Sequence, residues 1–262
     1  MSVAVSLVVD DLGYHAPPAP SILELFLKFI KFNLIVIIGF PYIAVKCIIN
    51  YSKVKQIIGK ALKRPITKEI YYQDKKMREL VLKSKIGSLY RDILEYQKVE
   101  GYCASATTRN VCKSIKKHPC KLIEPKYAPS VPRKVANAID QSFHDDKVKS
   151  YCILGNEGYV KFIEGLKLVN NVNYRVGVNF LRSPLFGFTW SILPSTLILN
   201  LFGGHFSNVL YFDEDTQIVG VFDVNHKYSL WFCDAYRLYE AVNTFDITSN
   251  EERGLVITEI LN

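Results

Sequence analysis

The 262-residue sequence lacks the cysteine patterns of a metal finger or a disulfide framework. Its six cysteines are scattered, no Cys-x-x-Cys pair occurs, and no cleavable signal peptide precedes them. Because disulfide-rich domains and zinc sites depend on closely spaced cysteines, we expect free thiols, a reducing compartment, and no metal or other cofactor. Cys112 and Cys120 flank a short lysine-rich segment without an evident fourth ligand, which favours structural roles for both.

The signals of nucleic-acid binding are missing as well, although the chain is basic. No zinc-finger spacing, no recognition-helix pattern and no platform of interleaved basic and aromatic residues occurs. The formal net charge is +8, and the lysines and arginines are concentrated in residues 46–85 and 113–149. We therefore expect an anionic membrane surface or an acidic partner, and no nucleic acid. No pattern indicates an oligomeric state.

Apolar residues, by contrast, make up 49% of the chain, enough to bury one good-sized core. Residues 1–20 are expected to form a flexible lead, and residues 21–60 form a hydrophobic segment. The uncharged run of this segment, residues 32–45, is shorter than the roughly 18–20 residues of a membrane span, but lysines at both ends can reach the interface. Pro41 would kink a helix here. We expect membrane association, either by spanning or by lying in the interface.

A basic cluster follows the hydrophobic segment, at Lys53, Lys55, Lys60, Lys63 and Arg64. Because positive charges beside a span remain on the cytosolic side, residues 61–262 are expected to face the cytosol as the catalytic domain. Helices come first and mixed strands later, which indicates an α+β domain. Apolar spacing predicts helices over residues 66–96, 134–143 and 158–168 and strands over residues 148–154, 174–181 and 254–258.

The rest of the chain is organised around residues 203–225, which predict two strands joined by an acidic turn. Apolar residues alternate on both sides of the polar turn 213–217, the pattern of a hairpin. His205 opens the first strand and Asp223 closes the second, so a hairpin brings them to the same end. A carboxylate beside an imidazole fixes its tautomer and stabilises the imidazolium. Such a pair predicts a nearby nucleophile.

Cys103 is the best candidate for this nucleophile, because a segment compatible with a helix follows it. At the start of a helix, backbone N–H groups favour the thiolate over the thiol, and a nearby imidazolium adds to the effect. Gln97 lies six residues upstream. Its side-chain amide can donate to an oxyanion next to the Cys103 N–H, so one short segment would supply both nucleophile and charge stabiliser.

The order of these motifs resembles the phytochelatin synthases and their shorter bacterial relatives, papain-like cysteine transferases or hydrolases that act on glutathione. The likeness covers roughly residue 86 to the end. It is carried by Gln97 ahead of Tyr102-Cys103, Gly204-His205-Phe206-Ser207, Asp223-Val224, Lys227-Tyr228, Trp231 and Leu238-Tyr239-Glu240-Ala241.

This resemblance implies a papain-like fold, with the nucleophile helix packed on an antiparallel sheet. It implies a catalytic triad of Cys103, His205 and Asp223, with Gln97 as the oxyanion residue.

Two positions depart from that family. The family usually has an arginine three residues after the aspartate, where it meets a substrate carboxylate, but this chain has His226, and a neutral imidazole cannot replace a bidentate guanidinium. The family's glutamate two residues after the glutamine is replaced by Val99, and Glu100 comes one position late. We name Tyr102, Asn225 and His226, which border the motifs, as candidate substrate-binding residues.

A second apolar run, residues 184–202, stands where the resembled family has a much shorter connection. Pro194 and several hydroxyl groups argue against a span. We expect a hydrophobic hairpin over the active-site mouth that dips into the membrane, or else additional core packing.

The sequence thus predicts acyl transfer or amide hydrolysis through an acyl-enzyme on Cys103. By resemblance, the first substrate is glutathione, a small thiol peptide. The alternative keeps the triad but acts, as a membrane-associated thiol protease or deconjugase, on a membrane-borne amide or thioester in a peptide, protein or lipid conjugate. A third hypothesis is a catalytically silent membrane adaptor.

Overall fold

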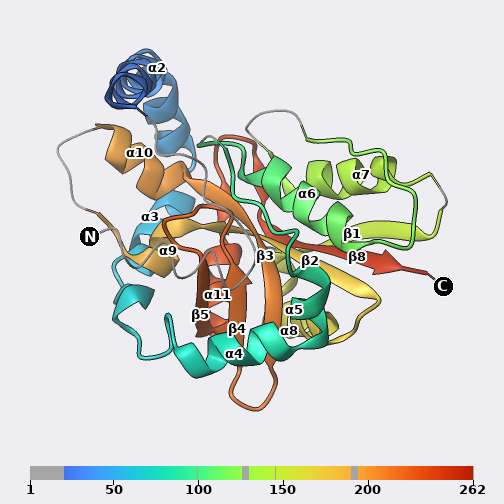
Figure 1. The fold of residues 1–262 in the computed structure, drawn as a ribbon. Coiled ribbons are helices and arrows are strands. Elements are labelled where there is room, and N and C mark those ends of the chain that lie inside the picture. Colours follow the sequence, from blue (N-terminus) through green and yellow to red (C-terminus); the bar gives the residue numbers. More distant parts are fainter. Residues whose placement is uncertain (1–20, 99, 126–129, 145, 190–193, 262) are drawn as a thin grey trace.

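A six-stranded antiparallel sheet lies at the centre of the computed structural model, which describes residues 21–98, 100–125, 130–144, 146–189 and 194–261 (Figure 1). The strand order is β1-β8-β2-β3-β4-β5. These strands are β1 (Val148–Leu154), β2 (Tyr174–Leu181), β3 (Gly204–Asp213), β4 (Ile218–Phe222), β5 (Leu230–Asp234) and β8 (Gly254–Ile260). A separate two-stranded ribbon pairs β6 (Phe245–Asp246) with β7 (Glu251–Glu252).

Helices cover both faces of this sheet, so the α+β class predicted from the sequence is confirmed. One face carries α6 (Cys103–Ser114) and α7 (Pro132–Ser142), and the other carries α8 (Tyr159–Lys167) and α11 (Ala235–Val242). Side chains of β8 point alternately to the two faces of the sheet. Val256 packs with the α6 and α7 side chains, whereas Leu255 and Ile257 pack with those of α8 and α11. This alternation is the period-2 geometry of a strand buried on both faces.

Helical segments fill the described chain ahead of the nucleophile helix. They are α2 (Ile22–Ile49), α3 (Tyr51–Ala61), the 3₁₀ turn η1 (Ile66–Lys68), α4 (Lys75–Lys83) and α5 (Lys85–Tyr90). Helix α2 begins with a capping box in which Ser21 and Glu24 bond each other's backbone N–H groups. It stands out from the body of the molecule and meets α3 and α10 near its C-terminal end (Figure 1).

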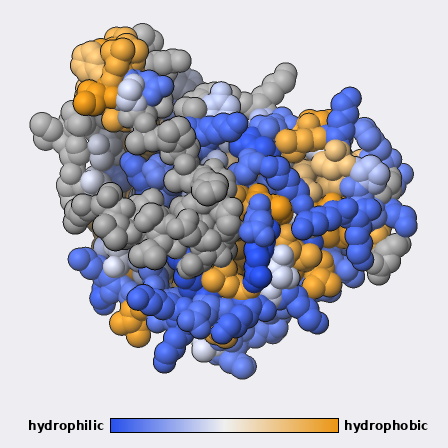
Figure 2. All heavy atoms as spheres, in the orientation of Figure 1, coloured by the Kyte–Doolittle hydropathy of each residue, from blue (hydrophilic) through white to orange (hydrophobic). Residues whose placement is uncertain are grey.

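Helix α2 exposes an unusual amount of apolar side chain, and Figure 2 shows these residues gathered at its free end. Ile22 is 87% exposed, and Phe26 and Phe29 are each 57% exposed. Within the part of the chain that the structure describes, however, no helix combines the length and hydropathy needed to cross a bilayer. The prediction of a transmembrane segment is therefore not supported. Residues 1–20, expected to be flexible, lie outside the described residues.

The apolar run 184–202 forms two short helices, α9 (Arg182–Phe186) and α10 (Pro194–Phe202), joined through residues of which 190–193 lie outside the description. Leu185 is fully buried in the main core, and Phe186 stacks on Tyr228 with 4.3 Å between ring centroids. Helix α10 packs against α2 and α3. Core packing, one of the two expectations for this run, is thus found for α9.

Most of the elements predicted from apolar spacing are present. The hairpin is confirmed as β3 and β4, with a register shift between Val209 and Tyr211. Strand β2 occupies the predicted residues, and the helices predicted at 134–143 and 158–168 appear as α7 and α8. Strand β5 was not predicted, because its first four residues are an unbroken apolar run that periodicity alone cannot assign. Helix α11 was not predicted either. Two 3₁₀ turns, η2 (Gly155–Glu157) and η3 (Leu168–Asn170), flank α8.

Asn110 ties helix α6 to the chain that leads to Gln97. It is fully buried, its Oδ1 accepts the Glu95 N–H at 2.7 Å, and its Nδ2 donates to the Glu95 carbonyl at 3.1 Å. The same nitrogen donates to Asn208 Oδ1 on β3 at 3.1 Å. One amide therefore fixes the distance between helix, strand and the segment before Gln97.

We expect Asn110→Ala to lower the free energy of unfolding by about 2–3 kcal/mol, because it leaves the Glu95 backbone groups without partners. Urea unfolding followed by circular dichroism measures this loss. Asn137→Ala, on the exposed face of α7, is the matched control and should change stability by less than about 0.5 kcal/mol. Equal losses in the two variants would contradict the role given to Asn110.

Candidate active site

Cys103 is the first residue of α6, as the sequence predicted. Tyr102 is the N-cap and offers no side-chain cap hydrogen bond, so the first backbone N–H groups of the helix remain available to a negative charge. The thiol is half-buried and hydrogen-bonds the side chain of His205. Burial alone would raise the pKa of Cys103, but the hydrogen bond and charge of His205, with help from the Phe206 backbone and Arg182, lower that pKa below its ordinary value.

The hairpin places His205 beside Asp223. His205 Nε2 lies 2.5 Å from Asp223 Oδ1, and both side chains are fully buried. Two further donors hold the carboxylate: the Asn225 N–H at 2.8 Å from Oδ1 and Trp231 Nε1 at 3.3 Å from Oδ2. Burial would lower the pKa of His205, but the Asp223 carboxylate outweighs it and raises that pKa to about 9. Because Nε2 is engaged by Asp223, Nδ1 is the nitrogen that faces the thiol.

Arg182 also reaches Nδ1. Its Nη2 lies 2.9 Å from His205 Nδ1, and its Nη1 forms an ion pair with Glu100 at 2.8 Å. Burial disfavours the charged guanidinium, but Glu100 and Asp223 outweigh this and raise the pKa of Arg182. The arginine follows β2 directly, and β2 pairs with β3 up to Leu181 and Gly204. Strand pairing therefore positions this cation beside the histidine.

Gln97 is buried beside the same group of side chains. Its backbone N–H donates to the Val224 carbonyl at 2.7 Å, which docks its segment next to Asp223. Its Nε2 donates to Glu100 Oε2 at 3.0 Å, so one of its two amide N–H groups is engaged and one remains for an oxyanion. Its Oε1 is buried without a hydrogen-bond partner among the described residues.

The three candidate substrate-binding residues differ in their surroundings. Tyr102 is 41% exposed at the start of α6. Asn225 is buried, and its Nδ2 donates to Glu100 Oε2 at 3.4 Å, so its contacts are internal to the site. His226 packs edge-on against Tyr96, and burial together with the Lys227 charge lowers its pKa. A neutral imidazole is therefore expected at that position at neutral pH.

Sequence reasoning missed the roles of Arg182, Glu100 and Trp231. Arg182 carries no motif, and only the β2–β3 register brings it to His205. Glu100 stands one residue away from the position of the family's glutamate, yet it accepts hydrogen bonds from Gln97, Arg182 and Asn225. Trp231 belongs to the motifs that carry the resemblance, but no role was predicted for it. Its indole nitrogen bonded to Asp223 supplies one.

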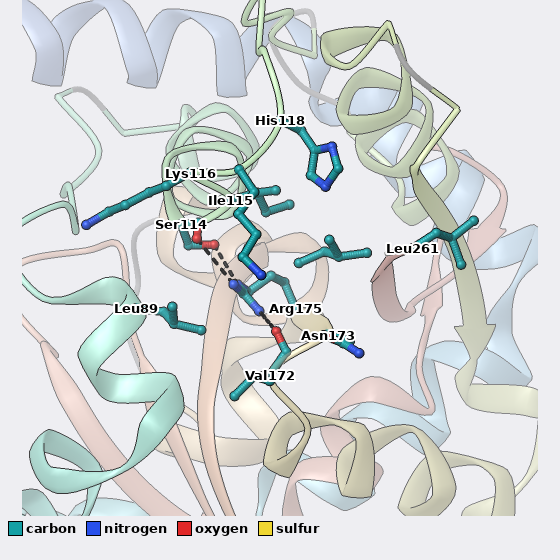
Figure 3. A pocket seen from close by; sticks show the side chains of 11 residues that line it. Leu89, Ser114, Ile115, Lys116, His118, Val172, Asn173, Arg175 and Leu261 are labelled. Atoms are coloured by element: carbon teal, nitrogen blue, oxygen red, sulfur yellow. Dashed lines mark hydrogen bonds between the residues drawn. The ribbon is translucent and has the colours of Figure 1, made fainter.

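A cavity of about 510 Å³ opens away from this site, at the C-terminal end of α6 (Figure 3). Its wall includes the buried Arg175, whose guanidinium donates to the hydroxyl of Ser114 and the carbonyl of Val172. The Arg175 guanidinium also donates to the Ser114 carbonyl at 3.2 Å, and this bond caps the last turn of α6, which carries partial negative charge. The described residues contain no group of three or more histidines, cysteines or carboxylates able to hold a metal ion.

A thiol at a helix start, an imidazole and a buried carboxylate together form the type of site used by cysteine-dependent acyltransferases and hydrolases. The family model of phytochelatin synthase matches residues 196–255, which include His205 and Asp223 but not Cys103. This match supports the resemblance to the phytochelatin synthases noted in the sequence. That family is enzymatic. No significant match to a curated protein was found.

The lowered pKa of Cys103 predicts its reactivity with iodoacetamide, since only the thiolate is alkylated. Cys120 is more exposed, but burial of its thiol raises its pKa. As pH falls, the thiolate of Cys103 persists to lower pH, so Cys103 should be labelled faster than Cys120 at neutral pH. Mass spectrometry of peptides from protein labelled across a pH series measures both rates.

The matched variant for this prediction is His205→Ala. It removes the hydrogen bond and charge that lower the pKa of Cys103, so burial then dominates and the labelling profile of Cys103 should move to higher pH. Labelling of Cys120 should not change. The assignment would be wrong if Cys120 reacted as fast as Cys103 in the wild-type protein at neutral pH.

Proposed function

We propose that this protein is a cysteine-dependent acyltransferase or amide hydrolase that works through an acyl-enzyme on Cys103. The observation that supports it best is the hydrogen-bonded series from Asp223 through His205 to the Cys103 thiol. Helix α6 carries the nucleophile and packs on β3, which carries the histidine. That placement agrees with the papain-like arrangement implied by the resemblance.

The chemistry follows from the atoms at hand. The Cys103 sulfur attacks an amide or thioester carbonyl carbon while its proton passes to His205 Nδ1, and a tetrahedral oxyanion forms. Its collapse breaks the bond to the leaving nitrogen or sulfur, which takes the proton from Nδ1. Water or a second amine then attacks the thioester, His205 accepts the proton of that attacker, and the thiol is restored.

The oxyanion is stabilised by two donors in this proposal. One is the backbone N–H of Cys103 at the start of α6, and the other is the free N–H of the Gln97 amide. Asp223 holds the proton on Nε2, so Nδ1 is the atom that exchanges a proton with the thiol, and the carboxylate stabilises the imidazolium that results. Trp231 and the Asn225 N–H hold that carboxylate in place.

Glutathione is the first substrate to test, because the chain is phytochelatin synthase-like. Attack on its cysteinyl carbonyl would release glycine and leave γ-glutamylcysteine on Cys103. Hydrolysis then gives free γ-glutamylcysteine, and transfer to the amine of a second glutathione gives a longer peptide.

We expect wild-type protein to release glycine from glutathione and Cys103→Ser to do so at least about 10³-fold more slowly, because a serine hydroxyl is a far weaker nucleophile here than a thiolate. Free glycine and the intact mass of the protein are measured together. A mass increase equal to γ-glutamylcysteine on Cys103 would identify the acyl-enzyme.

The matched control is Cys112→Ser, a second cysteine of the same helix that lies in the α6–α7 core. It should retain activity as far as it remains folded, which circular dichroism checks. No release and no adduct, with Cys103 labelled no faster than buried Cys233, would favour instead the catalytically silent adaptor.

A membrane-borne substrate is the second candidate, and the exposed apolar surface of α2 supports it. Apolar patches above a few hundred Å² on soluble proteins mark sites that contact a membrane or a partner. Helix α10, from the apolar run before His205, packs on this helix. Basic side chains lie along the following helix and turn, where Lys55 is exposed. The others contact the catalytic part of the chain or their own turn: Lys53 pairs with Glu252, Lys63 with Glu240 and Arg64 with Glu69, and Lys60 donates to the Asn243 carbonyl. We propose that α2 lies in the interface of an anionic membrane, with the catalytic domain on the cytosolic side.

Flotation with liposomes tests this second candidate. We expect the protein to bind vesicles containing about 30% phosphatidylserine, and binding to fall at least tenfold in Phe26→Gln/Phe29→Gln, since each buried phenyl ring contributes about 1–3 kcal/mol. The control Val160→Gln/Tyr236→Gln alters two exposed apolar residues of α8 and α11 and should bind as the wild type does. Equal binding by both double variants would refute interfacial docking through α2.

A further inference from the structure

Arg182 occupies a position that the proposed chemistry does not use. Its Nη2 lies 2.9 Å from His205 Nδ1, the atom that takes the proton from Cys103 and passes it to the leaving group. The guanidinium also lies over the Tyr228 ring, with 5.9 Å to the centroid. Its Nε is buried without a hydrogen-bond partner among the described residues. The proposed chemistry does not explain why a cation lies beside Nδ1, the atom that exchanges the proton.

The contact between Arg182 and Nδ1 holds in only one protonation state of His205. A guanidinium only donates hydrogen bonds, so a hydrogen bond to Nδ1 requires a lone pair there and a neutral imidazole, the form that the raised pKa of His205 disfavours at neutral pH. When His205 takes the proton of Cys103, two N–H groups would face each other at this distance. Arg182 therefore competes with the thiol for Nδ1, and it has to shift before proton transfer can occur.

Glu100 is the ion-pair partner of Arg182 that a substrate carboxylate can replace. Their ion pair measures 2.8 Å, but the Glu100 side chain is 62% exposed whereas that of Arg182 is 19% exposed. Because the Glu100 carboxylate faces solvent, water can take over its hydrogen bonds when another anion binds Arg182. An incoming carboxylate that sheds its water in the site can compete with both Glu100 and Nδ1 for the guanidinium. A fork of parallel N–H groups binds such a carboxylate in bidentate fashion.

We propose that Arg182 forms a carboxylate-binding subsite on the leaving-group side of His205, and that occupation of this subsite releases Nδ1 for catalysis. The inference rests on the proposed function of Cys103 and His205. It makes Arg182 a specificity-determining residue for substrates whose leaving group bears a carboxylate.

The short distance from Nδ1 to Nη2 limits which carboxylate fits. The leaving nitrogen must come within hydrogen-bonding distance of Nδ1 to be protonated. In an α-amino acid, the carboxylate carbon is two bonds from that nitrogen, about 2.5 Å away, so its oxygens come close to Arg182. The substrate class is therefore a peptide or amide that loses one C-terminal amino acid. Cleavage at an internal peptide bond would place a neutral amide beside Arg182, and a neutral amide cannot form an ion pair with a guanidinium.

His226 does not offer an alternative cation. Burial and Lys227 lower its pKa, so it is neutral at neutral pH and lacks the charge to hold a carboxylate. Of the described side chains that bond His205, only Arg182 carries a permanent positive charge.

Two alkylating agents test the subsite without knowledge of the natural substrate. Iodoacetate carries a carboxylate next to the carbon that the Cys103 sulfur attacks, and iodoacetamide has the same size without the charge. In both reactions the S–C bond forms as iodide leaves. We expect the rate ratio of iodoacetate to iodoacetamide at Cys103 to fall at least about tenfold in Arg182→Gln. Arg182→Lys should give an intermediate ratio, because it keeps the charge and loses the fork.

Lys227→Gln is the matched control, since it removes an exposed cation near the site that does not bond His205. Its ratio should equal that of the wild type. If Cys103 reacts rapidly with iodoacetamide and Arg182→Gln leaves the ratio unchanged, the subsite is refuted while the nucleophile stands. If Cys103 reacts no faster than Cys120, the proposed function itself fails.

The second arm uses substrates. Wild-type protein should cleave glutathione with a kcat/KM at least about tenfold above that for glutathione amidated at its glycine carboxyl. Arg182→Gln should abolish this preference chiefly by lowering the value for glutathione. Equal kcat/KM values for acid and amide in the wild-type protein would overturn the proposal even if both substrates are cleaved.

Discussion

The hydrogen-bonded series from Asp223 through His205 to Cys103 is the interaction on which the rest of the site depends. The three members come from different parts of the fold: the residue that follows β4, the start of β3 and the first residue of α6. Both His205 and Asp223 are fully buried, and a buried charge is costly unless it is paired and hydrogen-bonded. The indole of Trp231 and the N–H of Asn225 meet this demand at the carboxylate. The core around the sheet therefore holds the charges of the site in one geometry.

A second set of charges lies directly outside that series. Glu100 accepts hydrogen bonds from Gln97, Arg182 and Asn225, so the candidate oxyanion donor and the cation beside His205 share one partly exposed carboxylate. A ligand that changes the partner of Arg182 thus also changes the surroundings of Gln97. This coupling gives a physical route by which binding of the leaving group and stabilisation of the oxyanion can be linked.

The N-terminal part poses a different physical problem. Helix α2 is long and carries apolar side chains that the rest of the described chain does not cover. Exposed aromatic and aliphatic groups favour transfer to a less polar phase, and the exposed Lys55 on the next helix favours an anionic one. The sheet and the helices on it are held by their own core. In the proposed function, α2 positions the protein, and the sheet with α6 carries the chemistry.

Local patterns in the sequence determined the hairpin, the helix that starts at Cys103, strand β2 and the α+β class, because period-2 and helical spacing act over a few residues. Spacing together with resemblance also named Cys103, His205 and Asp223. The position of Arg182 was decided only by tertiary structure, since it follows from the register of β2 on β3. The same holds for Glu100, Trp231 and the two short helices of residues 184–202. Contacts between residues far apart in the chain leave no local period, so these features required the folded molecule.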